Sequence, residues 1–98
     1  MKHLDEVIKE SRPTLVVFQH SGEVNAVDEN IVFEEVKSKY EGKANVISVD
    51  CSRNGSYKEH YRFNGYPTWI LFKEGQELMR EGGNKTVAQI EQMLETAF

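Results

Sequence analysis

Few side chains in this sequence could perform covalent chemistry. Cys51 is the only cysteine among the 98 residues, so the chain can form neither an internal disulfide nor a zinc site built from thiolates. The sequence places no histidine and no cluster of cations to lower the pKa of Cys51, as a nucleophilic thiol requires. Free cysteines are more often small buried hydrophobic residues. Cys51 is therefore a weak candidate for catalysis.

Three neighbouring residues, His20, Ser21 and Glu23, suggest a hydrolytic set or a metal site. Neighbours this close on one loop rarely converge as nucleophile, base and orienting group, and no Gly-x-Ser-x-Gly elbow is present. The other histidines, His3 and His60, fall on predicted helices among solvated neighbours, and nothing pairs them as ligands. We expect all three histidines at the surface, with no metal and no other cofactor.

Composition and charge limit the classes of partner. Apolar residues make up 39% of the chain, which is typical of one folded domain, here residues 1–98. The formal net charge is -4 and the cations are scattered, so nucleic acid is not an expected partner. The first residues are acidic where a signal peptide is apolar, and no window approaches membrane-spanning length. We expect a cytoplasmic monomer with no membrane partner.

The segment 63–75 gives the strongest structural signal in the chain. The Tyr66-Pro67 pair predicts a turn, and the apolar run 69–72 after it predicts a buried strand. A second turn at residues 74–75 allows 77–81 to return as the other arm of a hairpin, with Gly75 free to take a positive φ. Trp69 is expected in the core.

Hydrophobic periodicity places the other elements. An amphipathic helix at residues 4–8 precedes the apolar run 14–18, whose lack of alternation is typical of a central strand covered on both faces. A second helix should bury Val27, Ile31, Phe33, Val36 and Tyr40 before Gly42 ends it. A strand at 44–49, a turn at 50–55 and a short helix around 57–61 follow. The last helix, opened by a Thr86–Gln89 capping box, should bury Val87, Ile90, Leu94 and Phe98.

This order of elements predicts an α/β fold with a mixed four-stranded sheet flanked by helices on both faces. The first two strands should be parallel through a right-handed crossover, and the last two should be antiparallel. In such a sheet the ligand crevice lies where loops converge at the strand ends. The loops concerned are 19–25, 50–54, 65–68 and 82–83.

The chain resembles the thioredoxin family over nearly its whole length. The residues that carry the resemblance are 13–18, 34–40, Val49, Asp50, Tyr61, 65–68, 71–75 and Gly82. The resemblance implies a thioredoxin-like fold that lacks the first strand of the family. It also implies a cis peptide bond before Pro67.

In the same alignment, residues that cannot exchange a disulfide stand where the family has its redox centre. The two cysteines of its Cys-x-x-Cys motif fall on Glu23 and Ala26, and the aromatic residue before the motif falls on Gly22. The buried acid of the family and its lysine partner fall on Val17 and Ser48. Disulfide exchange needs an attacking thiolate and a second thiol that resolves the mixed disulfide. The resemblance therefore implies a domain without the redox dithiol.

The groove of the family remains, which predicts a non-catalytic module that binds a protein or an extended peptide by strand addition. The predicted binding residues are Gly22, Glu23, Tyr66, Pro67, Thr68 and Gly82. Glu23 has two interpretations: a mimic of the thiolate charge, or an acid of the kind favoured in any first helical turn. The alternative function is thiol-disulfide oxidoreductase activity through Cys51 with an external thiol such as glutathione. A third possibility is a scaffold that uses a helix face.

Overall fold

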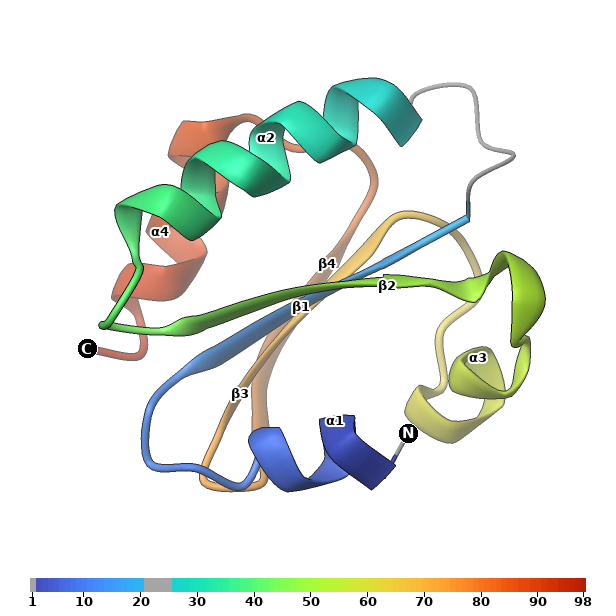
Figure 1. Ribbon diagram of the computed structural model, residues 1–98, viewed down its shortest axis with the longest axis horizontal. Coiled ribbons are helices and arrows are strands. Elements are labelled where there is room, and N and C mark those ends of the chain that lie inside the picture. Colours follow the sequence, from blue (N-terminus) through green and yellow to red (C-terminus); the bar gives the residue numbers. More distant parts are fainter. Residues whose placement is uncertain (1, 21–25) are drawn as a thin grey trace.

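The computed structural model describes the backbone of residues 2–20 and 26–98 and the side chains of residues 4–20 and 30–98. Its elements are α1 (Lys2–Val7), β1 (Thr14–Gln19), α2 (Ala26–Lys39), β2 (Asn45–Asp50), the 3₁₀ turn η1 (Cys51–Arg53), α3 (Ser56–Tyr61), β3 (Thr68–Lys73), β4 (Gln76–Gly82) and α4 (Val87–Glu95). Figure 1 shows α2 and α4 on one face of the sheet and α1 and α3 on the other. Within the described residues, every helix is too short or too polar to cross a lipid bilayer.

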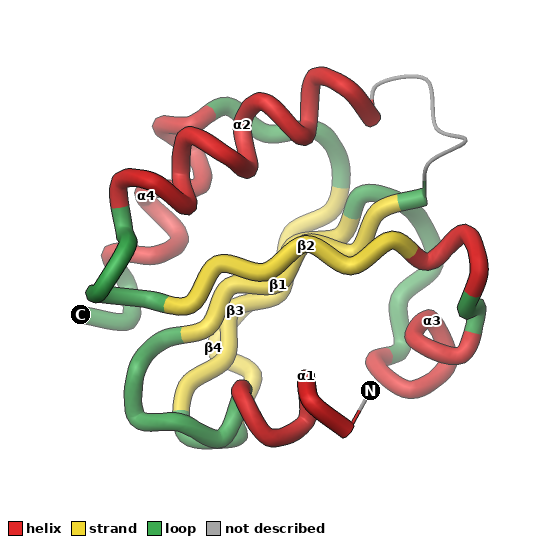
Figure 2. Tube along the Cα trace, in the orientation of Figure 1, coloured by secondary structure: helices red, strands yellow, loops and turns green. Residues whose placement is uncertain are grey.

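The sheet has the strand order β2-β1-β3-β4. β1 runs parallel to β2 and antiparallel to β3, and β3 forms an antiparallel hairpin with β4. All residues of β1 are buried, because helices cover both faces of this central strand. The predicted mixed four-stranded sheet flanked by helices is therefore confirmed (Figure 2).

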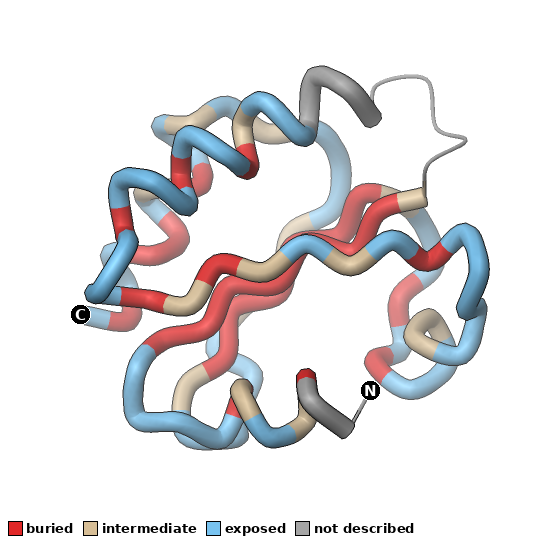
Figure 3. Tube along the Cα trace, in the orientation of Figure 1, coloured by how far each residue is buried: buried red, intermediate tan, exposed pale blue. Residues whose placement is uncertain are grey.

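The core has two parts, one on each face of the sheet. Alternation along β1 sends Leu15 and Val17 toward α2 and α4, and Val16 and Phe18 toward α1 and α3. Trp69 is fully buried in the first part, as expected. Figure 3 shows the buried residues following the two central strands, β1 and β3, and the parts of the helices packed against them, whereas β2 and β4 are mostly intermediate or exposed.

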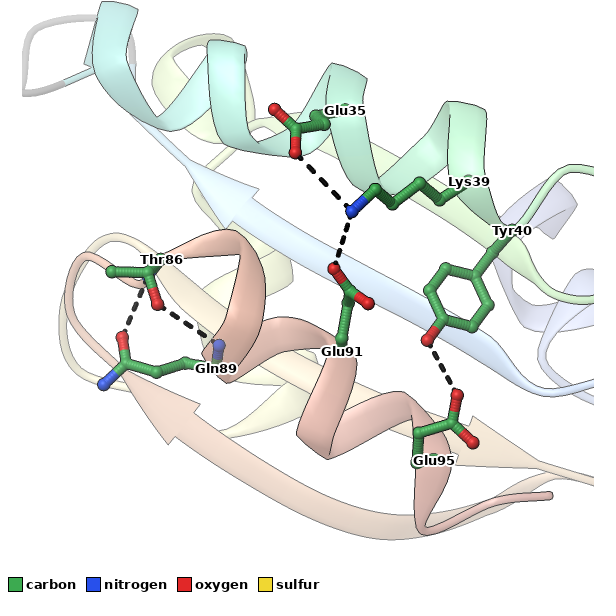
Figure 4. A network of polar contacts seen from close by, with 7 residues as sticks. All are labelled: Glu35, Lys39, Tyr40, Thr86, Gln89, Glu91 and Glu95. Carbon is green, nitrogen blue, oxygen red and sulfur yellow. Dashed lines mark hydrogen bonds and ion pairs between the residues drawn. The ribbon is translucent and has the colours of Figure 1, made fainter.

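Polar contacts join α2 to α4 outside the core (Figure 4). Lys39 Nζ lies 3.0 Å from a carboxylate oxygen of Glu91 and 3.8 Å from one of Glu35. The Tyr40 hydroxyl donates a 2.9 Å hydrogen bond to Glu95. Burial, with this carboxylate beside it, raises the pKa of Tyr40 to about 12. These contacts link the C-terminal end of α2 to α4 beside the apolar residues through which the two helices pack.

The N-terminus of α4 is capped as the sequence predicts. The Thr86 side chain accepts a hydrogen bond from the Gln89 amide, and the Gln89 side chain accepts one from the Thr86 amide. This reciprocal pair is the predicted capping box, which satisfies amide groups that have no partner within the helix.

Two residues predicted to be in the core are exposed. Ile31 is 63% exposed and Phe98 is 60% exposed, so both predictions are wrong. Ile31 precedes the buried Phe33 by two positions, which is roughly 200° around the helix axis. Phe98 lies beyond the end of α4, where helical periodicity no longer applies, and it stacks on Tyr40 at the surface. Met93, which the pattern did not single out, is buried instead.

The β3–β4 turn also holds the segment that follows α1. Gly75 has a φ of 82°, as the sequence suggests, and Glu74 also takes a positive φ, of 54°. The Glu74 amide donates to the carbonyl of Glu10 at 3.0 Å, and the Gly75 amide donates to that of Ile8 at 2.8 Å. The left-handed conformation of Glu74 was not predicted, since nothing local in the sequence requires it.

Candidate functional site

A shallow cleft of about 390 Å³ lies between the α3–β3 connection and the end of β4. Its lining residues are Arg62, Phe63, Asn64, Gly65, Tyr66, Pro67, Thr68, Arg80, Glu81, Gly82 and Gly83. The two segments meet because Thr68 pairs with Gly82 across the hairpin. The structure thus brings together Tyr66, Pro67, Thr68 and Gly82, all of which the sequence marked for binding.

The floor of the cleft is a turn held by its own hydrogen bonds. The peptide bond between Tyr66 and Pro67 is cis. The Thr68 hydroxyl donates to the carbonyl of Gly65 at 2.7 Å, and the Gly83 amide donates to that of Pro67 at 2.9 Å. Pro67 and Thr68 are buried. The turn is therefore joined to both the preceding loop and the end of β4.

Tyr66 is half-buried at the side of the cleft and is surrounded by other side chains. Its ring centroid lies 5.7 Å from that of Phe63 and 5.4 Å from that of His20. Lys58 Nζ lies 5.6 Å from the same centroid, within the range of a cation–π contact. Tyr66 is thus oriented by its neighbours while it keeps some accessible surface.

The histidines do not all lie at the surface as expected. His20 is half-buried beside Tyr66, so that prediction is wrong for His20. His60 is exposed, with Nε2 3.5 Å from a carboxylate oxygen of Asp5. The side chain of His3 lies outside the described residues. Among the described side chains, no group of three or more metal-ligating residues is found.

Arg80 braces one side of the cleft. Its guanidinium donates to the carbonyls of Arg62 at 2.7 Å and Tyr61 at 2.9 Å, and to both carboxylate oxygens of Glu77. The hydrogen bonds from Arg80 hold the pKa of Glu77 below its ordinary value. Sequence reasoning missed Arg80, because the carbonyls of Tyr61 and Arg62 at the C-terminal end of α3 become its neighbours only when the hairpin folds against that end.

Cys51 lies behind the cleft and not in it. The residue is 3% exposed, and its burial raises the pKa of the thiol, although a hydrogen bond with Tyr66 opposes the shift. A buried thiol that is protonated at neutral pH is a poor nucleophile. The structure therefore agrees with the interpretation of Cys51 as a small core residue.

The other predicted site residues lie at the edge of what is described. Gly22 and Glu23 fall outside the described residues, so their roles stay predictions. Ala26 begins α2, and its side chain is also outside the described set. The cleft at residues 62–68 and 80–83 is thus the described part of the candidate site.

Comparison of the sequence with known proteins finds similarity to thioredoxins. The family model described as Thioredoxin matches residues 3–96. A thioredoxin from Staphylococcus aureus is 33% identical over 64 residues, which are 65% of this chain and 62% of that protein. A thioredoxin domain-containing protein from Theileria parva is 34% identical over 58 residues, which are 59% of this chain and 26% of that protein. The chain thus spans less than two thirds of these curated relatives.

Solved structures show the same fold. A designed protein superposes with a TM-score of 0.85 at 20% identity, covering 98% of this chain and 85% of that one. A cysteine-to-serine mutant of a thioredoxin from Entamoeba histolytica superposes with a TM-score of 0.83 at 22% identity, covering 97% and 91%.

Proposed function

Because this chain belongs to the thioredoxin family and contains a single cysteine, we propose that it is a redox-silent module that binds an extended segment of another protein. The observation that carries the proposal is the cleft at Tyr66, Pro67, Thr68 and Gly82. The parts of the fold that form a groove are present, whereas a dithiol is not.

The state of the one thiol supports the non-catalytic half of the proposal. Disulfide exchange by a dithiol needs a thiolate and a resolving thiol. Cys51 has no second cysteine in the chain, it is buried, and its pKa is raised by that burial. The alternative of a single-thiol oxidoreductase therefore finds no support in the surroundings of Cys51.

The shape of the cleft supports the binding half. A Cβ atom added at Gly65 or at Gly82 would meet no atom within 4 Å, so the space beside both backbones is open. An extended segment can approach a bare backbone closely, and main-chain pairing then supplies affinity while side-chain contacts supply specificity. Tyr66 offers an aromatic surface for such a contact, and Arg62, exposed on the rim, offers a positive charge.

Peptide display on the full chain, followed by calorimetric titration of the selected peptide, tests the proposal. Gly82→Val places a branched side chain in the cleft at a strand position with room for it. We expect this variant and Tyr66→Ala to weaken binding by at least about tenfold, which corresponds to about 1.4 kcal/mol.

The matched control is Phe98→Ala, which removes an exposed aromatic residue at the C-terminus, next to Tyr40. This variant should bind like the wild type. Failure to select any peptide, or unchanged affinity in both cleft variants, would show that the cleft is not a binding site.

A further inference from the structure

Among the described residues that line the cleft, three carry a charge, and two of these are already paired with a neighbour. An Arg80 nitrogen lies 2.6 Å from a carboxylate oxygen of Glu77, and Lys85 Nζ lies 3.2 Å from one of Glu81. The third, Arg62, is exposed and forms no ion pair with any side chain that the structure describes. Its charge on the rim of the cleft is therefore uncompensated within the described part of the chain.

The backbone of Arg62 has a conformation that favours glycine. Arg62 ends α3 with a φ of 58° and a ψ of 61°, in the left-handed region. Helices often end in this region with a glycine, because a Cβ atom there comes too close to the following carbonyl oxygen. The Arg62 amide donates to the carbonyl of Lys58, and the Arg62 carbonyl accepts from Arg80 at 2.7 Å, so the conformation is held from both sides. Arginine at this position is therefore less stable than glycine would be.

No charged partner offsets this strain among the described side chains. The guanidinium of Arg62 forms neither an ion pair nor a cation–π contact with them. Strained backbone that persists beside a cleft supports a function for the side chain that it carries. Glu74 is the other described non-glycine residue with a positive φ, and it lies at the far end of β3 from Pro67, away from the cleft.

A second cation lies on the same side of the cleft. Lys58, in the last turn of α3, is half-buried with its Nζ 5.6 Å from the ring centroid of Tyr66. The acid between the two cations, Glu59, is exposed and is not among the described lining residues. The α3 side of the cleft therefore presents positive charge, although the chain as a whole has a net charge of -4.

We infer that the segment bound in the cleft carries an acidic side chain, and that Arg62 is the residue that selects it. The inference rests on the proposed function and adds the chemistry of the partner, a protein segment with aspartate or glutamate beside Arg62. A guanidinium presents its donors in a fixed fork that matches a carboxylate. The net charge of the chain opposes an acidic partner at long range, but salt screens charges more than about 8 Å apart at physiological ionic strength. The local pairing at Arg62 then provides the selectivity.

Peptide display on the full chain tests the inference, with a library in which glutamate and glutamine are equally frequent. The selected peptides should be enriched in glutamate. Calorimetric titration then compares a selected peptide with the same peptide carrying glutamine in place of each glutamate. The wild type should bind the glutamate peptide about fivefold more tightly, which is the upper range for an ion pair at an exposed position.

Two glycine variants separate the side chain from the backbone. Arg62→Gly removes the guanidinium and suits the left-handed conformation, so the variant should fold and should bind both peptides equally well. Glu74→Gly makes the same kind of change away from the cleft and should keep the preference for glutamate. Both variants should melt at a higher temperature than the wild type, because glycine relieves the strain at each position.

The outcomes distinguish this inference from the proposed function. Failure to select any peptide would remove the cleft as a binding site and the inference with it. Peptides that bind without preferring glutamate would leave the proposed function standing and overturn the role of Arg62. A preference for glutamate that survives in Arg62→Gly would overturn that role too. So would a lower melting temperature of Arg62→Gly, since the side chain would then serve the fold.

Discussion

At the scale of single residues, Cys51 gives the clearest chemical prediction. Its burial raises the thiol pKa, so a thiol-selective reagent should label the native chain much more slowly than the unfolded chain at neutral pH. The labelling rate should rise only above the ordinary thiol pKa. Rapid labelling at neutral pH, or reduction of insulin with glutathione that Cys51→Ser abolishes, would contradict this account and favour the single-thiol enzyme.

The hydrogen bond between Tyr61 and Asp5 gives a prediction that depends on pH. The Tyr61 hydroxyl donates to the Asp5 carboxylate at 2.6 Å, and this bond is the main cause that lowers the pKa of Asp5. A lowered pKa means that the stabilisation is complete above the ordinary pKa of aspartate and is lost as pH falls through the native value. Burial, more than this bond, raises the pKa of Tyr61, so the hydroxyl stays protonated at neutral pH.

We therefore expect Tyr61→Phe to lower the free energy of unfolding by about 1 kcal/mol at neutral pH. The difference from the wild type should shrink in acid, where Asp5 is protonated. Urea unfolding across this pH range measures it, and Tyr57→Phe on the same helix serves as the control. A difference that is constant down to the acid limit would mean that the Asp5 carboxylate contributes nothing.

At the scale of elements, the start of α4 can be tested through its cap. Thr86→Ala removes the side-chain oxygen that accepts from the Gln89 amide, which should cost about 1 kcal/mol of stability. Thr86→Ser keeps that oxygen and should cost less. If thermal unfolding showed both variants to be equally destabilised, the loss would come from the threonine methyl group and not from the cap.

Arg80 links two elements and is predicted to matter to both stability and binding. Lysine at this position keeps the charge but cannot bond in a fork to Glu77 while also reaching the carbonyls of Tyr61 and Arg62. Arg80→Lys should therefore destabilise the fold by about 1 kcal/mol and weaken the affinity of the selected peptide. Unchanged stability and affinity would show that Arg80 does not brace the cleft.

Features that depend on neighbouring residues in the chain could be predicted from the sequence, and features that depend on remote contacts could not. The capping box at Thr86, the turn glycine Gly75 and the apolar run of β1 depend on neighbours in the chain, and all are confirmed. Ile31 and Arg80 depend on contacts that are remote in sequence. Ile31 looked like a core residue because its type is apolar, while the position of α2 on the sheet turns it outward.

At the scale of the whole molecule, the two edge strands of the sheet, β2 and β4, have different surroundings. The cleft lies beside the charged and irregular edge at β4, and β2 forms the opposite edge of the described sheet. The sequence predicted which loops converge near Tyr66 and Gly82, because the hairpin fixes their distance. It also predicted the central position of β1, because the apolar run 14–18 lacks alternation.

The central claim is that the cleft holds an extended protein segment, and mapping the contact by NMR tests it most directly. In a titration of the isotope-labelled chain with the display-selected peptide, the largest amide shifts should fall on residues 65–68 and 82–83. Amides of α2 and of β2 should move little. Shifts concentrated on a helix face, or spread evenly over the molecule, would contradict the account and place the interaction elsewhere.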